Sequence, residues 1–159
     1  MTFVILSSPI ILKKYLNKYN TYDKKDNLDK ILMIRRAKEP FKGHWQLPGG
    51  KIKLGEKPID ALKREVKEEV GLDVDIEKTE FVNYYEHYYH EFKTHFFFLA
   101  FRCCIADEDG KELDNIEEIN KKIRLAQEEA TEYGWFTKKE LKDMNLLCGA
   151  RIITDNYNF

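Results

Sequence analysis

Three glutamates, Glu65, Glu68 and Glu69, fall within five positions of the chain. On an α-helix this spacing of i, i+3 and i+4 places all three carboxylates within an arc of about 100°. Like charges at such spacings destabilise a helix by roughly 0.2–0.5 kcal/mol per pair. A hard divalent cation would reverse that effect, because Mg²⁺ takes carboxylate oxygens as ligands and bridges them to phosphates. The spacing therefore indicates either a metal site or the solvated face of a charged helix.

A helix over residues 58–70 must position these glutamates. At about 100° per residue, four aliphatic side chains form one stripe that can face a core: Ile59, Leu62, Val66 and Val70. Pro58 suits the first turn and Gly71 suits the C-terminal cap. Gly49 and Gly50, just upstream, let the backbone approach a ligand closely. Because the acidic arc borders the stripe, we expect a solvent-facing carboxylate cluster close to the protein body.

The segment from Gly50 to Leu72 resembles a Nudix box, whose pattern is G-x5-E-x7-R-E-U-x-E-E-x-G-U with U an aliphatic residue. Every fixed position is met without a gap, and the flanking stretches "GHWQLPGG" and "EYGWFTKKEL" are also similar to that family. The matching residues are Gly50, Glu56, Arg64, Glu65, Val66, Glu68, Glu69, Gly71 and Leu72.

The resemblance implies an α/β/α sandwich with a mixed sheet, in the α/β class. It also implies that Mg²⁺ or Mn²⁺ is bound by Glu65, Glu68, Glu69 and the carbonyl of Gly49. By the same resemblance, Glu56 and Arg64 form an ion pair that braces the loop and the helix. Members of this family hydrolyse a nucleoside diphosphate linked to another group, X.

A further carboxylate in this family often serves as the general base, from a loop before the last strand. Glu128, Glu129 and Glu132 all lie in that part of the chain. By its distance from Trp135, Glu129 best matches the family's position. The alternative is that all three are solvated surface acids.

Several side chains are candidates for binding the substrate, although core packing is the alternative role for each aromatic residue. Aromatic rings stack on any base, so they indicate a class of ligand and not its identity. His95 is one of three histidines that could contact phosphate. The candidate substrate-binding residues are Arg36, Phe41, Trp45, Tyr89 and His95.

Two stretches give different indications of the substrate. "THFFFLAFR" is similar to a strand in Nudix enzymes that act on GDP-sugars, and "EPFKGHWQLPGG" is similar to a stretch in ADP-ribose pyrophosphatases. We therefore expect a Mg²⁺-dependent pyrophosphohydrolase in which water attacks phosphorus, with a nucleotide sugar, ADP-ribose or a nucleoside triphosphate as substrate. The alternatives are a GDP-sugar hydrolase that attacks the sugar carbon and a Nudix module that only binds nucleotides.

Composition limits the possible partners. The chain has 159 residues and a net charge of −1, which argues against a protein that coats a nucleic acid polymer. Three cysteines without a CxxC pair favour idle thiols in a reducing compartment, so we expect a cytoplasmic protein. The apolar N-terminus is short and contains Pro9, so neither a signal peptide nor a membrane span is expected.

The remaining elements interleave strands and helices in a single domain. Strands are expected at 2–12, near a sheet edge because of Pro9, and at 30–36, 72–92, 94–106 and 132–136. The strand at 94–106 is apolar on both faces and should be central. Polar and acidic insertions are expected at 13–29 and 107–127, and a helix at 137–144 should have Thr137 as its N-cap.

The acidic insertion carries a helical stripe of four aliphatic residues, which must be buried somewhere. We expect it either to cover an edge of the sheet or to form a homodimer contact. Its members are Leu113, Ile116, Ile119 and Ile123.

Overall fold

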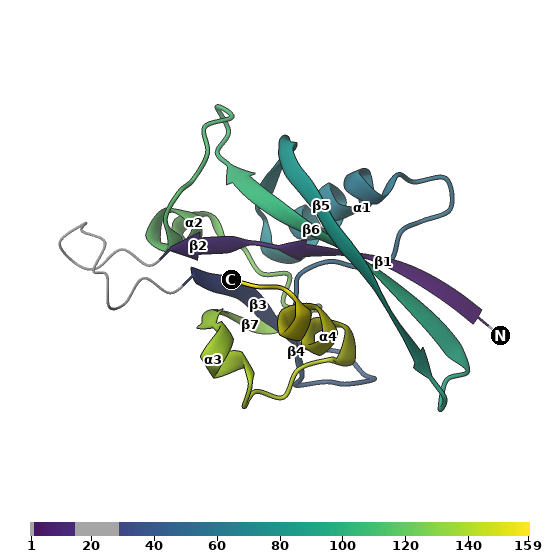
Figure 1. Cartoon of the computed structure of the whole chain (residues 1–159). Helices are drawn as coiled ribbons and strands as arrows, with labels where there is room; N and C mark the ends of the chain where they lie inside the picture. Colours follow the sequence, from purple (N-terminus) through teal and green to yellow (C-terminus); the bar gives the residue numbers. More distant parts are fainter. Residues whose placement is uncertain (1, 15–28) are drawn as a thin grey trace.

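The structure is a computed structural model that describes residues 2–14 and 29–159 (Figure 1). Its strands are β1 (Thr2–Ile10), β2 (Leu12–Lys14), β3 (Asp29–Arg36), β4 (Trp45–Gln46), β5 (Asp73–Tyr89), β6 (Thr94–Ala106) and β7 (Ala130–Thr137). Its helices are α1 (Pro58–Val70), α2 (Ile116–Lys122), α3 (Lys138–Leu141) and α4 (Cys148–Asn156). The ends of the predicted insertion at 13–29 belong to β2 and β3, and the rest of it lies outside the described residues.

The strands form two sheets, one with a parallel and an antiparallel pair and the other with antiparallel pairs between its strands. One sheet has the order β1-β6-β5, and in the other β3 is flanked by β2, β4 and β7. β1 runs parallel to β6, from Thr2 opposite Thr94 to Ile10 opposite Arg102, whereas β5 and β6 form a long antiparallel hairpin. The central place of β6 and the edge place of β1 confirm the predictions from the apolar run and from Pro9.

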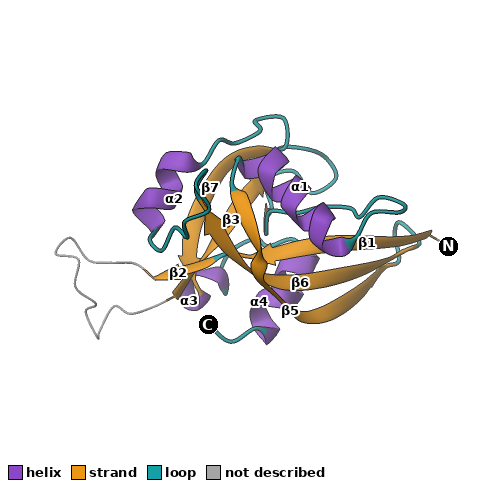
Figure 2. Cartoon of the chain, turned by 90° about the horizontal axis from the view of Figure 1, so that it is seen from above, coloured by secondary structure: helices purple, strands orange, loops and turns teal. Residues whose placement is uncertain are grey.

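Helices cover both faces of the strands, with α1 and α2 on one side and α3 and α4 on the other (Figure 2). Side chains of β3 alternate between two hydrophobic cores, because successive residues of a strand point to opposite faces. Leu32 and Ile34 pack in the core that contains α1, and Ile31 and Met33 pack in the core that contains α4. This two-sided burial explains the unbroken apolar run of β3 and confirms the predicted α/β/α sandwich with a mixed sheet.

The helix predicted over residues 58–70 is α1, with the same bounds. Pro58 occupies its first turn, and Gly71 ends it in the left-handed region at φ 74°, where its N–H donates to the carbonyl of Lys67. Leu62, Val66 and Val70 are fully buried. The cap residues and the aliphatic stripe therefore specify this helix locally.

The helix predicted from the aliphatic stripe of the acidic insertion is shorter than expected, because α2 covers only Ile116–Lys122. All four aliphatic residues of the stripe are nevertheless buried within this chain. Leu113, Ile119 and Ile123 belong to the core that contains α1. The stripe is therefore already covered inside one chain, and the expected homodimer contact is not needed to bury it.

Three elements were not predicted as such: β2, β4 and α4. β4 is only a two-residue strand, which is too short for a periodic signal. α4 begins after Leu147, whose side chain makes no capping hydrogen bond, so the usual start signal for a helix is missing. Thr137, by contrast, caps α3 as predicted. Within the described ranges no helix is long and apolar enough to cross a membrane.

Candidate active site

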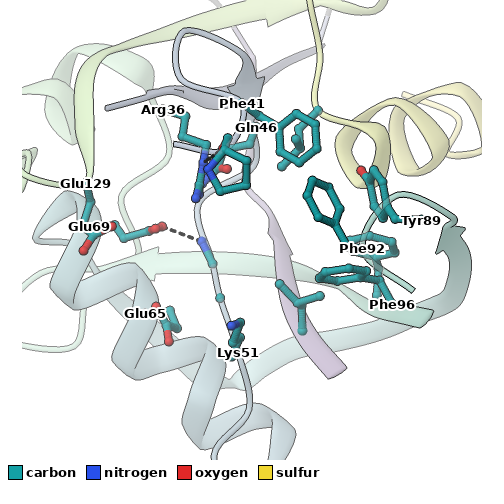
Figure 3. A pocket seen from close by; sticks show the side chains of 16 residues that line it. Arg36, Phe41, Gln46, Lys51, Glu65, Glu69, Tyr89, Phe92, Phe96 and Glu129 are labelled. Carbon is teal, nitrogen blue, oxygen red and sulfur yellow. Dashed lines mark hydrogen bonds between the residues drawn. The ribbon is translucent and has the colours of Figure 1, made fainter. Parts of the chain in front are cut away.

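A pocket of about 350 Å³ opens where α1, the β5–β6 hairpin and the loop between β3 and β4 meet (Figure 3). One side of it carries three carboxylates, Glu65, Glu69 and Glu129, which we call the acidic wall. The opposite side is built from aromatic rings, and we call this set the aromatic wall: Phe41, Tyr89, Phe92, Phe96 and Phe98. The cationic side chains that line the same pocket are those of Arg36 and Lys51.

Glu69 is buried, with 7% of its surface exposed, which corrects the expectation of a wholly solvent-facing cluster. Its carboxylate accepts a hydrogen bond of 2.6 Å from the backbone N–H of Gly49. Burial raises the pKa of Glu69 to about 8 despite this bond, and the nearby charges of Glu65 and Glu129 act in the same direction. A cation beside these carboxylates would relieve the unfavourable burial of like charges.

Only glycine fits at position 49. Its φ is +127°, and an added Cβ would lie 2.4 Å from the carbonyl oxygen of Ser7. The backbone can therefore pass between β1 and α1 closely enough for its amide to reach Glu69.

Arg64 joins the loop before α1 to the carboxylates of the helix. Its guanidinium contacts both oxygens of Glu56, at 2.7 and 2.9 Å, and this pairing lowers the pKa of Glu56 to about 2. The same guanidinium donates to Glu65 at 2.6 Å and to Glu68 at 3.2 Å. The Glu56–Arg64 ion pair predicted from the sequence is thus present, and it extends to two of the predicted metal ligands.

The donor set of α1 fits a hard divalent cation chemically, because carboxylate oxygens are the ligands that Mg²⁺ and Mn²⁺ prefer. In the conformation described for residues 2–14 and 29–159, however, no three His, Cys, Asp or Glu side chains are grouped so as to hold a metal ion. Glu68 is 57% exposed and does not line the pocket. The carboxylates take their hydrogen bonds from Arg64 and Gly49 instead.

Of the three candidate bases, the structure brings only Glu129 to the pocket. Its carboxylate is paired with Lys38, and its backbone carbonyl accepts from the N–H of Ala37 at 2.9 Å. Glu132 pairs with Arg35 at 2.8 Å, and Glu128 is exposed. The acidic wall thus contains one carboxylate from outside the box segment.

Arg36, Phe41 and Tyr89 line the pocket, but the other two substrate candidates do not. Trp45 packs edge-on against Phe136, with ring centroids 5.0 Å apart. His95 stacks on Phe97 at 4.7 Å. Because residues alternate along a strand, His95 points to the face of β6 opposite to the pocket.

Most of the aromatic wall and two polar side chains, those of Gln46 and Lys51, were not predicted from the sequence. Phe96 and Phe98 lie on one face of β6 and Phe92 lies in the turn before it. Gln46, next to Trp45, also lines the pocket. The alternation in "HFFFL" indicates that Phe96 and Phe98 share a face, but nothing local shows which face borders the pocket.

Comparisons with known proteins give one family and several relatives. The family described as NUDIX domain matches residues 21–155. A Methanocaldococcus jannaschii protein named ADP-ribose pyrophosphatase is 45% identical over 76 residues, which are 42% of this chain and 44% of that protein. The human 8-oxo-dGDP phosphatase NUDT18 is 47% identical over 49 residues, or 31% of this chain and 15% of that protein. The matched segments thus span less than half the length of these relatives.

Solved structures share the fold at low sequence identity. A MutT NUDIX hydrolase from Burkholderia pseudomallei superimposes with a TM-score of 0.72 at 19% identity, covering 99% of this chain and 100% of that one. The NUDIX domain of Shewanella oneidensis NrtR, solved with ADP ribose, gives a TM-score of 0.63 at 14% identity, covering 98% and 86%. At such identities the likeness supports the fold alone.

Proposed function

This chain belongs to the NUDIX family, and from that membership we propose that it hydrolyses a phosphoric anhydride bond. The substrate is a nucleoside diphosphate linked to a group X, or a nucleoside triphosphate. Water attacks phosphorus and releases a nucleoside monophosphate together with phosphorylated X, or with pyrophosphate from a triphosphate. The observation that carries this proposal is the division of one pocket into an acidic wall and an aromatic wall.

The two walls suit the two ends of such a substrate. A flat base stacks on the aromatic wall, since stacking on aromatic rings is favourable for every base. The diphosphate then reaches the acidic wall, where Arg36 and Lys51 supply positive charge. Carboxylates by themselves repel phosphate, so this end of the pocket requires divalent cations as well.

Glu65, Glu68, Glu69 and the carbonyl of Gly49 are the groups that would hold Mg²⁺ or Mn²⁺. Such an ion, when bound, neutralises charge that develops on the phosphate oxygens and lowers the pKa of a bound water. To serve as ligands, Glu65 and Glu68 must turn away from Arg64, which contacts both. The ion pair of Arg64 with Glu56 keeps the guanidinium in place during that change.

Glu129 is the candidate general base. Its carboxylate lines the pocket beside Glu69 but comes from the segment before β7 and not from α1. In this role it accepts the proton of the attacking water. The ion pair with Lys38 orients its carboxylate before substrate binds.

The substrate remains one of three classes: a nucleotide sugar, ADP-ribose or a nucleoside triphosphate. The similarity to proteins named ADP-ribose pyrophosphatase and 8-oxo-dGDP phosphatase supports a nucleotide derivative of this kind. Among the residues that line the pocket in the described part of the chain there is no histidine. This observation favours attack at phosphorus over a mechanism in which a histidine activates water to attack the sugar carbon.

A panel of nucleotide sugars, ADP-ribose and nucleoside triphosphates, assayed with Mg²⁺ and coupled to a phosphatase, tests the proposal. We expect phosphate release from at least one class, and loss of that release in Glu69→Gln. Hydrolysis in oxygen-18 water should place the label in a phosphate product. Label on the sugar hydroxyl would overturn attack at phosphorus, and absence of turnover on the whole panel would favour a module that only binds nucleotides.

A further inference from the structure

Gln46 is the one side-chain amide among the described residues that line the pocket. The residue as a whole is 9% exposed. Figure 3 shows it beside Arg36 and Phe41, between the acidic wall and the aromatic wall. Its neighbours in the lining are either charged groups that suit phosphates or rings that suit stacking.

The backbone around Gln46 is held on both sides. β4 pairs with β3, with Gln46 opposite Ile34. The N–H of Trp45 donates to the carbonyl of Asn145 at 2.9 Å, and the carbonyl of Trp45 accepts from the N–H of Leu147 at 2.8 Å. Since Trp45 turns its ring to the core, Gln46 faces the pocket by strand alternation. Its amide is therefore placed before any ligand binds.

The amide of Gln46 makes no hydrogen bond with any side chain or backbone group of residues 2–14 and 29–159. In that same part of the chain, the one buried side-chain polar atom without a partner belongs to Ser7 and not to Gln46, so the Gln46 amide reaches the space of the pocket. An amide that faces the pocket without a protein partner keeps its acceptor and its two donors available to a ligand. A ligand in the pocket is the group that can supply both a donor and an acceptor to it.

We propose that Gln46 selects the base of the substrate, through hydrogen bonds to the edge of the base that stacks on the aromatic wall. An amide offers an acceptor and two donors in one plane, and the edges of different bases differ in their order of donors and acceptors. The aromatic wall accepts any base, and the charged side chains act at the phosphates. Selection among bases therefore depends on Gln46. This inference rests on the proposed function, because it assigns a role within the same site.

Two panels that vary only the base test the inference: the four ribonucleoside triphosphates, and ADP-, GDP-, CDP- and UDP-glucose. We expect Gln46→Leu to reduce the ratio of kcat/KM between the preferred base and the others by roughly ten-fold, since a well-placed amide pair discriminates to that degree. Gln46→Glu has the same shape but replaces donors by an acceptor, so it should change the order of preference. Gln127→Leu, at an exposed glutamine, is the matched control.

Affinity for the four nucleoside monophosphates, measured by calorimetry without metal, gives a second readout that does not depend on turnover. If the wild-type protein hydrolyses nothing, the proposed function fails, and the monophosphate affinities still decide the role of Gln46. An equal loss for all bases would overturn the inference, because a purely structural residue acts uniformly. A change of preference for X at constant base would also overturn it. Thermal midpoints identify any variant that is simply unfolded.

Discussion

At the scale of single residues, three glutamates on one helix occupy three different environments. Glu69 is buried and bonded to the amide of Gly49. The side chain of Glu65 is 16% exposed and contacts Arg64, whereas that of Glu68 is 57% exposed. A shared arc on the helix therefore does not mean equal chemistry, since the three carboxylates differ in burial and Glu69 has a different hydrogen-bond partner from Glu65 and Glu68.

We predict that Glu69→Gln and Glu68→Gln each lower kcat by on the order of 100-fold or more, because each removes a carboxylate that we propose as a ligand of the cation beside the phosphates. Glu69→Gln should not unfold the protein, since the amide oxygen of glutamine can still accept the hydrogen bond from Gly49. Steady-state kinetics and thermal unfolding measure the two effects. A smaller loss is expected for Glu56→Gln, which weakens a brace. Unchanged activity in both Glu68→Gln and Glu69→Gln would contradict the assignment.

At the scale of elements, short helices depend on their ends. α3 has only four residues, and its start is held by a capping box. The hydroxyl of Thr137 accepts from the N–H of Glu140 at 3.3 Å, and the N–H of Thr137 donates to the Glu140 carboxylate at 2.7 Å. The hydroxyl of Thr137 also donates to the Glu140 carboxylate at 2.8 Å. The backbone N–H of Thr137 and then its hydroxyl lower the pKa of Glu140.

Thr137→Ala should reduce the free energy of unfolding by about 1 kcal/mol at neutral pH, the usual effect of losing an N-cap. Because the pKa of Glu140 is lowered in the folded state, its hydrogen bonds contribute to the free energy of unfolding above the unfolded-state pKa. This contribution is lost as pH falls through the folded-state pKa. The difference in the free energy of unfolding between Thr137→Ala and wild type should therefore become smaller in acid. Urea denaturation at several pH values tests this, and a difference that grows in acid would disprove it.

α2 has only seven residues, and the buried side chains of Ile116 and Ile119 attach it to the domain. Ile119 is fully buried in the core that contains α1. We predict that Ile119→Ala lowers the free energy of unfolding by about 2–4 kcal/mol, as for other buried isoleucines, and leaves the oligomeric state unchanged. The exposed neighbour Glu118→Ala should change stability by less than about 0.5 kcal/mol. Light scattering measures the oligomeric state. If an oligomer of the wild-type protein dissociated in Ile119→Ala, the stripe would form a homodimer contact after all.

At the scale of the whole molecule, the pocket draws its walls from segments far apart in the chain. The acidic wall combines α1 with the segment before β7, and the aromatic wall combines the β5–β6 hairpin with the loop after β3. Like charges are thus gathered by the fold itself, at a cost that the packing of both cores must offset. A ligand that relieves this repulsion should stabilise the entire domain.

We expect Mg²⁺ to raise the thermal midpoint, because a ligand that binds only the folded state adds about 2.7 kcal/mol at a concentration of 100 Kd. For a domain of this size that is a shift of roughly 5–10 °C. The combined variant Glu65→Gln/Glu68→Gln/Glu69→Gln should show no such shift. Differential scanning fluorimetry at constant ionic strength measures it, and an equal rise in wild type and variant would locate the cation elsewhere.

Local signals by themselves determined much of the fold. Pro58, Gly71 and the aliphatic stripe between them specify α1, and Thr137 specifies the start of α3, because caps and helical periodicity act within a few residues. The apolar run of β6 placed that strand in the centre of a sheet. The same signals missed α4, which is held by packing against the second core and lacks a capping side chain.

For the site, the sequence determined which residue types are present, and the tertiary structure decided which of them meet. The spacing of Glu65, Glu68 and Glu69 was sufficient to place them on one side of α1, but the tertiary structure decides that Glu69 is buried and bonded to Gly49. Strand register and contacts between distant segments decide three further features of the site. They bring Glu129 to the pocket, place Gln46 inside it and turn His95 away from it. Periodicity shows which side chains share a face, but the element that covers this face is set by long-range pairing, which no local pattern contains.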